Sequence, residues 1–311
     1  MGSGLVRLSS VRLREMVFRA RNIFVSVLVV FLLALPSPAQ QDSAPDLPPT
    51  NDPREIVRRS VEIDHRTIEL ARNYTCQQRE VTKQLGSHGE VKSTEIKTWD
   101  ITVLYGEPYL RLIEKDDKPL SAKDEQKEEE KLDKFINKRK NESEEERQKR
   151  QAKEKKEREE ERAFLRDVVN AYDFQIVGEE AVDGRAAWVI EATPRKDFHP
   201  TQPHADILPK IQGRIWIDKQ EYNWVKAEAE AIDTISFGLF IARIHKGSRF
   251  SFEQVRLNNE VWLMRRFYLN GSARVLLFKN EAVEQEDTFS NYKKFTTATK
   301  ILPGAIEVEP K

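Results

Sequence analysis

The sequence predicts an α+β protein in which helices pack against a long antiparallel sheet. Three observations lead to this fold class. Strand-like segments follow one another from residue 172 to residue 295 without a helical pattern between them, one amphipathic helical pattern occupies residues 53–73, and nearly every residue from 121 to 162 is charged. Consecutive strands of this kind exclude a doubly wound parallel sheet, in which strands and helices alternate.

The N-terminus carries the features of an export signal. Five arginines and one glutamate in the first 22 residues precede an apolar run from Ile23 to Leu35, and small residues stand at Ser37 and Ala39. This order is typical of a cleavable secretory signal, predicted over residues 1–39. The alternative is an uncleaved anchor helix, but the run is shorter than the roughly 20 residues that span a bilayer. We therefore expect a periplasmic or otherwise extracytoplasmic protein that is soluble, with no stable transmembrane span, after cleavage.

A linker and a helix are predicted next. Residues 40–52 are polar and proline-rich, which is typical of a flexible linker. Asp52 stands at an N-cap position and Pro53 at the first helical position. Apolar residues then recur at spacings of three and four, so the helix has one apolar face and ends near Asn73.

A meander of strands follows the helix. The expected strands cover residues 74–85, 90–105 and 109–114, with turns at residues 86–89 and 106–108. In the second strand, Trp99, Ile101 and Val103 alternate with polar residues and so share one face of the sheet.

The charged stretch predicts two helices, over residues 121–140 and 143–171. Ser121 with Asp124, and Ser143 with Glu146, each have the spacing of a capping box. Apolar residues do not recur at the a and d positions that a coiled coil needs. Two interpretations stay open: a solvated excursion held by ion pairs and docked only at its ends, or an arm that binds a partner.

The remaining strands are long and apolar on both faces. Asp183 and Gly184 form a strong hairpin signal, and residues 194–209 form an irregular, proline-rich loop. The expected strands are 174–182, 185–193, 211–218, 224–233, 235–244, 247–257, 261–278 and 282–295, with a turn or bend at Asn270 and Gly271. Strict alternation over residues 261–269 places Trp262, Met264 and Tyr268 on one face and Val261, Leu263, Phe267 and Leu269 on the other. Both faces must therefore be covered, and we expect helices on one and a ligand on the other.

No pattern of residues indicates catalysis or a resident cofactor. Metalloprotease, nucleophile-elbow, phosphate-loop and dinucleotide motifs are all missing from the sequence. The nearest approach to a metal site is His199, His204 and Asp206, which lie in the proline-broken loop and are expected to be surface residues. Cys76 is the single cysteine, so an internal disulfide is excluded. Without the leader the chain is mildly acidic, which disfavours nucleic acid as a partner. We predict that the protein is not an enzyme and holds no metal.

Five tryptophans fall in or beside the predicted strands, and two uses of them stay open. They fill an ordinary core, or some of them line an apolar cavity between sheet and helices. On the second interpretation the candidate ligand-lining residues are Trp99, Ile101, Val103, Trp188, Trp216, Trp262, Met264 and Tyr268.

Three stretches resemble a known superfamily: residues 177–185 with Trp188, Val189 and Ile190; residues 208–218, which end in Trp216, Ile217 and Asp218; and the returning strand from Trp224 to Glu228. These hairpin signatures, with the leader and the order of elements, are similar to the LolA/LolB-like half-barrel superfamily of lipoprotein-sorting proteins. The resemblance implies a curved antiparallel sheet, an incomplete β-barrel, whose open side is plugged by helices and whose apolar concave face takes acyl chains. It implies a single half-barrel domain over residues 53–300, with residues 121–171 as a charged helical insert and residues 301–311 as a C-terminal tail.

The predicted function is therefore an exported, non-catalytic carrier of a lipid or an acylated protein. The long charged insert departs from the smaller carriers of this superfamily. The alternative is an envelope scaffold or sensor that binds a protein partner through residues 121–162.

Overall fold

The computed structural model describes residues 50–71, 73–202, 204–237, 242–275 and 279–295. The predicted signal over residues 1–39, most of the predicted linker and the predicted tail over residues 301–311 lie outside these residues. Within them, strands form one antiparallel sheet that three α-helices and a short 3₁₀ helix accompany.

The elements run in the order helix, meander, helical arm and long strands, where the arm is α3 and α4 together. Their bounds are α2 (Pro53–Ala71), β1 (Tyr74–Leu85), β2 (Val91–Leu104), β3 (Glu107–Lys115), β4 (Lys118–Pro119), α3 (Ala122–Lys140), α4 (Glu144–Ala171), β5 (Tyr172–Val182), β6 (Arg185–Pro194), η2 (Ala205–Lys210), β7 (Ile211–Asp218), β8 (Trp224–Ala231), β9 (Ile235–Phe237), β10 (Ala242–Ile244), β11 (Arg249–Leu257), β12 (Val261–Val275) and β13 (Lys279–Lys294).

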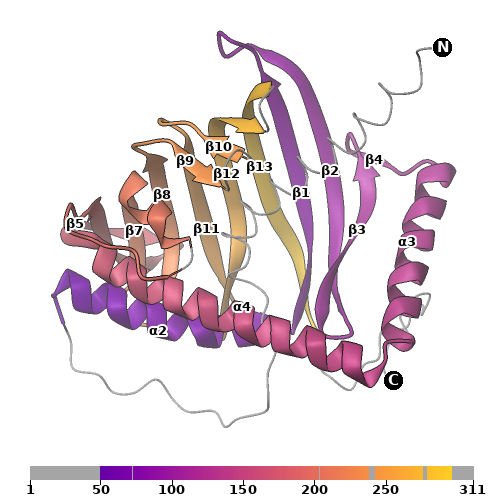
Figure 1. Cartoon of the computed structure of the whole chain (residues 1–311), viewed down its shortest axis with the longest axis horizontal. Helices are drawn as coiled ribbons and strands as arrows, with labels where there is room; N and C mark the ends of the chain where they lie inside the picture. The colour runs from indigo at the N-terminus through magenta and orange to yellow at the C-terminus, as the bar shows by residue number, and fades with distance from the viewer. Residues whose placement is uncertain (1–49, 72, 203, 238–241, 276–278, 296–311) are drawn as a thin grey trace.

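The sheet is open rather than closed into a barrel. Its strand order is β4-β3-β2-β1-β13-β12-β11-β8-β7-β6-β5, and the short strands β9 and β10 branch off β12. The meander joins the later strands through β1 and β13, where Tyr74 lies opposite Lys294 and Leu85 opposite Ala282. In Figure 1 the strands stand side by side from β5 at one edge to β3 and β4 at the other. The predicted α+β class with an open antiparallel sheet is confirmed.

The sheet is also strongly curved. Three strands, β11, β8 and β7, separate β12 from β6 along the strand order, so in a flat sheet those two strands would lie about 19 Å apart. The Arg265 side chain of β12 nevertheless reaches Asp183, in the turn between β5 and β6, at 2.8 Å. The sheet must bend between these strands to make that ion pair.

Helices α2 and α4 run together across one side of the sheet (Figure 1). In α2, Ile56 and Val57 are fully buried against the alternate residues Trp188, Ile190, Ile215 and Ile217 of β6 and β7. The Asp52 carboxylate accepts from the backbone N–H of Arg54 at 3.1 Å, as expected of an N-cap. Burial of this apolar stripe, rather than helix propensity, fixes α2 on the sheet.

The opposite side of β6, β7 and β8 is buried without a helix. Its core consists of Ala187, Val189, Trp216, Val225 and Trp262. The ammonium group of Lys226 lies 4.3 Å from the centre of the Trp216 ring, and the guanidinium of Arg185 lies 5.5 Å from that of Trp262. Long charged side chains cover this side with their apolar stems, so the tryptophans need no ligand to be buried there.

The hairpin motifs that carry the family resemblance are joined to each other in space. Asp218, at the end of β7, is fully buried. Its carboxylate accepts hydrogen bonds from Nε and Nη2 of Arg185, at 2.7 and 2.8 Å. The same carboxylate accepts from the backbone N–H groups of Gln220 and Glu221 at 3.0 and 2.7 Å. The motifs therefore have a structural role, because Asp218 holds its own turn and ties it to Arg185 of the other hairpin.

One predicted strand and one predicted loop were wrong in detail. The single strand expected over residues 235–244 is two short paired strands, β9 and β10, and the loop expected over residues 194–209 contains η2. At Gly271 the strand β12 continues without a turn: a Cβ atom there would lie 2.5 Å from the Ser248 hydroxyl, so the glycine serves a close approach.

The predicted alternation of β12 fails at Met264, because β12 has a bulge next to this residue. Glu253 lies opposite Arg266 whereas the next residue of β11, Gln254, lies opposite Met264, so Arg265 is the extra residue. Phe252 pairs with Phe267. Met264 therefore shares a side with Phe267 rather than with Tyr268, since the extra residue interrupts the alternation.

Candidate functional site

Two spaces lie between the sheet and the arm, and α4 borders both. The first, called here the apolar cavity, has a volume of about 170 Å³ and lies under the C-terminal turns of α4, over β6, β7, β8 and β11. The second, called here the large hollow, has a volume of about 1520 Å³ and lies between the arm and the strands β12, β13, β1, β2 and β3. The geometry of each follows from the residues that line it.

The apolar cavity exists because small residues form a row across neighbouring strands. Ala192 of β6 lies opposite Gly213 of β7, Gly213 lies opposite Ala229 of β8, and Ala229 lies opposite Phe250 of β11. A Cβ atom on Gly213 would lie 2.2 Å from the carbonyl oxygen of Glu228, so only glycine permits this approach of the two strands. The missing side-chain volume along the row leaves the space open.

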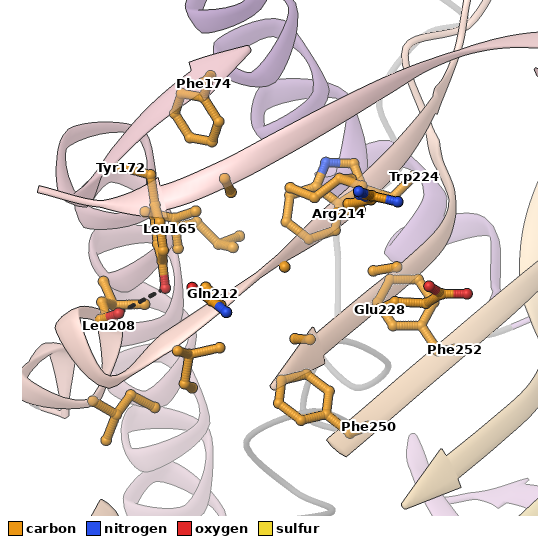
Figure 2. Close-up of a pocket in the computed structure, with 18 of the residues that line it drawn as sticks. Leu165, Tyr172, Phe174, Leu208, Gln212, Arg214, Trp224, Glu228, Phe250 and Phe252 are labelled. Carbon is orange, nitrogen blue, oxygen red and sulfur yellow. Dashed lines mark hydrogen bonds between the residues drawn. The ribbon is translucent and has the colours of Figure 1, made fainter. Parts of the chain in front are cut away.

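Large apolar side chains surround that row (Figure 2). They come from α4, η2 and the strands, and they are Phe164, Leu165, Val168, Tyr172, Phe174, Ile207, Leu208, Ile215, Trp224, Phe250, Phe252 and Met264. The planes of the Trp224 and Phe252 rings are inclined by only 3°, with centroids 6.4 Å apart. An engineered apolar cavity of about 150 Å³ stays dry and binds benzene, so this one can hold an apolar group of similar size.

The end of α4 that forms the roof of the cavity is tied down by hydrogen bonds. The Arg54 guanidinium donates to the carbonyl oxygens of Val169 at 2.8 Å and Tyr172 at 3.0 Å, at the C-terminus of α4. The Tyr172 hydroxyl donates to the Leu208 carbonyl oxygen at 2.8 Å. Burial raises the pKa of Tyr172 above its usual value, so the phenol stays neutral and keeps this bond.

One polar atom at the cavity wall lacks a partner. The Oε1 oxygen of Gln254, on β11, is buried and has no hydrogen bond to the described residues. An unsatisfied buried acceptor costs roughly 1–3 kcal/mol. The Gln254 amide therefore makes the cavity wall less stable than a fully hydrogen-bonded wall would be.

The large hollow has a floor of mixed polarity. Its apolar part includes Trp99, Ile101, Val103, Leu263, Met264 and Phe289, and its polar part consists of Gln78, Glu80, Gln285 and Asp287. Glu80 lies opposite Asp287 across β1 and β13, and the Gln285 amide donates to both oxygens of Asp287, at 3.1 and 3.0 Å. The uniformly apolar face that the family resemblance implied is thus restricted to the cavity.

The far wall of the hollow is attached to the sheet by a group of ion pairs, called here the latch. Arg139 of α3 reaches Glu107 of β3 at 2.6 Å and Glu142 at 3.2 Å. Arg150 of α4 reaches Glu142 at 2.8 Å, Glu107 at 3.0 Å and Glu154 at 3.1 Å. Hydrogen bonding from Arg150 lowers the pKa of Glu142, so the latch stays charged well below neutral pH.

Between the latch and the cavity, α4 is supported by its own charges. Lys153 pairs with Glu157 at 3.5 Å, and Lys156 with Glu160 at 3.6 Å, each four residues apart. The capping box at Ser143 and Glu146 is formed as predicted. Apolar burial in the described part of α4 begins at Ala163. These observations favour the interpretation of a helix docked at its two ends.

The structure brings half of the predicted ligand-lining residues together. Trp99, Ile101, Val103 and Met264 border the large hollow, and Met264 also borders the apolar cavity. Trp188 instead packs against α2, Trp216 and Trp262 lie in the core of the opposite side, and Tyr268 lies under the Arg266 guanidinium, at 5.8 Å. Contact of any of them with a ligand stays a prediction.

Sequence reasoning missed most of the cavity wall. Phe250 and Phe252, from β11, and Phe164, from α4, were not among the candidates, although Phe250 and Phe252 alternate as strand residues on one face do. The small residues Ala227 and Ala229 of β8 alternate in the same way. A search for small residues that alternate opposite large ones would have found this site.

Cys76 lies in the wall of the hollow, and its surroundings make it unreactive. Burial raises the pKa of its thiol to about 12, whereas a nucleophilic cysteine needs a lowered pKa. Among the described residues no group of three or more His, Cys, Asp or Glu is arranged to hold a metal ion. Within the same residues, no helix is both long enough and apolar enough to cross a membrane.

Comparison with known proteins gives structural likenesses and no sequence relatives. No protein-family model matches the chain, and no curated protein matches its sequence. Among solved structures, the chain is similar to a DUF1329 family protein from Desulfovibrio piger, with 11% identity, a TM-score of 0.27, and coverage of 80% of this chain and 95% of that one.

Two further solved structures carry the family description that the motifs suggested. A putative outer membrane lipoprotein-sorting protein domain from Vibrio parahaemolyticus has 11% identity, a TM-score of 0.27, and coverage of 79% of this chain and 95% of that one. A LolA superfamily protein from Nitrosomonas europaea has 10% identity, a TM-score of 0.25, and coverage of 78% and 94%. Likenesses of this strength assign neither a ligand nor a partner to the chain.

Proposed function

We propose that the protein is an exported, non-catalytic carrier that binds the apolar chain of a lipid or an acylated protein between its sheet and α4. The observation that carries the proposal is the apolar cavity, which opens where small residues cross three strands under a helix held at its ends. Natural cores close such space, because an empty apolar cavity costs stability. A retained cavity is therefore best explained by an occupant.

Binding would come from burial of apolar surface, at about 25 cal/mol per Å². The cavity offers apolar walls on every layer that borders it, namely α4, η2 and the strands. The larger hollow beside it has polar and charged walls, which suit a hydrated headgroup or the polypeptide of an acylated protein. The two spaces together fit an amphiphile.

Native mass spectrometry of protein purified from its own host tests the proposal, together with uptake of a fluorescent fatty acid. Ala227, on the cavity floor, is 7% exposed, so Ala227→Leu fills the cavity and should abolish uptake. Ala181 is exposed on the edge strand β5, so Ala181→Leu is the matched control and should bind normally. The absence of both co-purified lipid and fatty-acid uptake in the wild type would sink the proposal.

A second candidate is a scaffold or sensor that binds a protein partner through the arm. The observation that favours it is the self-supporting charged surface of α4, which is not buried against the sheet between the latch and Ala163. Replacing residues 121–162 with a short flexible linker separates the two candidates. The carrier should still take up fatty acid, whereas the scaffold should lose a partner that co-purifies with the full chain.

A further inference from the structure

Met264 lies at the boundary between the two spaces. It is 7% exposed, and it borders both the apolar cavity and the large hollow. The strand order explains its place, because the cavity floor ends on β11 and the floor of the hollow begins on β12 and β13. A ligand that occupied both spaces would therefore have to pass this side chain.

The bulge in β12 is what turns Met264 to this side. Arg265 is the extra residue, and Met264 lies opposite Gln254 of β11. Bulges commonly redirect a side chain next to a functional site. Without the extra residue, Met264 would share its side with Tyr268 and not with Phe267.

The backbone at Met264 is held while its surroundings leave the side chain room. The Tyr292 hydroxyl, from β13, donates to the Met264 carbonyl oxygen. The Met264 side chain borders both the apolar cavity and the large hollow, so it has open space beside it. An unbranched thioether side chain can change rotamer in such a space with little strain.

We propose that Met264 divides one continuous binding site into two compartments and sets how far an apolar chain penetrates from the hollow into the cavity. This inference rests on the proposed function and adds to it the residue that selects chain length. The bound chain would leave its polar end in the hollow, beside the charged arm, and insert its apolar end past Met264.

Competition against a fluorescent fatty acid by octanoate, dodecanoate and hexadecanoate tests the inference. In Met264→Ala the passage widens, so affinity for the longest chain should rise by about fourfold for each additional methylene that enters the cavity. In Met264→Phe the passage closes, so hexadecanoate should lose affinity while octanoate keeps it. Ala181→Leu, at an exposed position of the edge strand β5, is the control and should keep the wild-type profile.

The outcomes separate this inference from the function on which it rests. If the wild type binds none of the three acids, the inference is refuted, and if no lipid co-purifies either, the proposed function is refuted with it. If the wild type binds them but Met264→Ala and Met264→Phe change all three affinities by one common factor, only the partition is refuted. Thermal unfolding of each variant checks that the protein is folded.

Discussion

Removing the carboxylate of Asp218 is expected to destabilise the fold by about 3 kcal/mol. Asp218 is fully buried and accepts from two backbone N–H groups and from both nitrogens of a bidentate Arg185. In Asp218→Ala each orphaned backbone donor costs about 1 kcal/mol. In this variant Arg185 still has Glu221 at 3.7 Å. Loss of the Arg185–Asp218 ion pair therefore adds only about 1 kcal/mol rather than the full penalty of an unpaired buried charge.

Urea unfolding followed by tryptophan fluorescence measures this effect. The midpoint should fall with an unchanged slope, which identifies a change in stability rather than in the denatured state. Asp218→Asn keeps one acceptor oxygen for the turn but loses the charge and the second oxygen, which accepts from Arg185 Nε, so it should cost about half as much. Asp173, whose side chain is 74% exposed, gives the control Asp173→Ala. A loss within about 0.5 kcal/mol for Asp218→Ala, as for an ordinary surface substitution, would refute the reasoning.

Three further predictions concern the latch, the cysteine and the start of α2. Arg150→Gln removes three carboxylate contacts from the latch and should speed hydrogen exchange at the nearby helix ends. Lys156→Gln, which breaks an exposed ion pair, is the control and should leave the exchange rate unchanged. Equal exchange rates in the two variants would contradict a latch. Cys76, with a pKa of about 12, should react with iodoacetamide at pH 8 only after unfolding, and rapid labelling of the folded protein would overturn this. Hydrogen bonding, first from Arg58, lowers the pKa of Glu55 to about 2. Because the pKa is lower in the folded state, the resulting stabilisation is present above pH 4.5 and is lost as the pH falls toward 2. The urea midpoints of wild type and Glu55→Gln should therefore converge over that range, and divergence would contradict the prediction.

Local patterns accounted for the elements whose cause is local. The capping box at Ser143 predicted the start of α4, and the Asp183 and Gly184 pair predicted the hairpin of β5 and β6. Both signals act through atoms a few residues apart, so the sequence alone carries them. The bulge at Arg265 left no such signal, because it depends on how β11 pairs with β12. One extra residue was enough to reverse the predicted side of Met264.

The sequence by itself determined the antiparallel α+β class, the two charged helices and the need to bury both sides of the later strands. Only the tertiary structure decided which residues form the site. Ala192, Gly213 and Ala229 lie in three different strands and become one row through register, and Trp216 is buried under Lys226 rather than under a ligand. The reason is that periodicity states which residues share a face of one strand, whereas a cavity depends on which strands are neighbours and where a helix such as α4 crosses them.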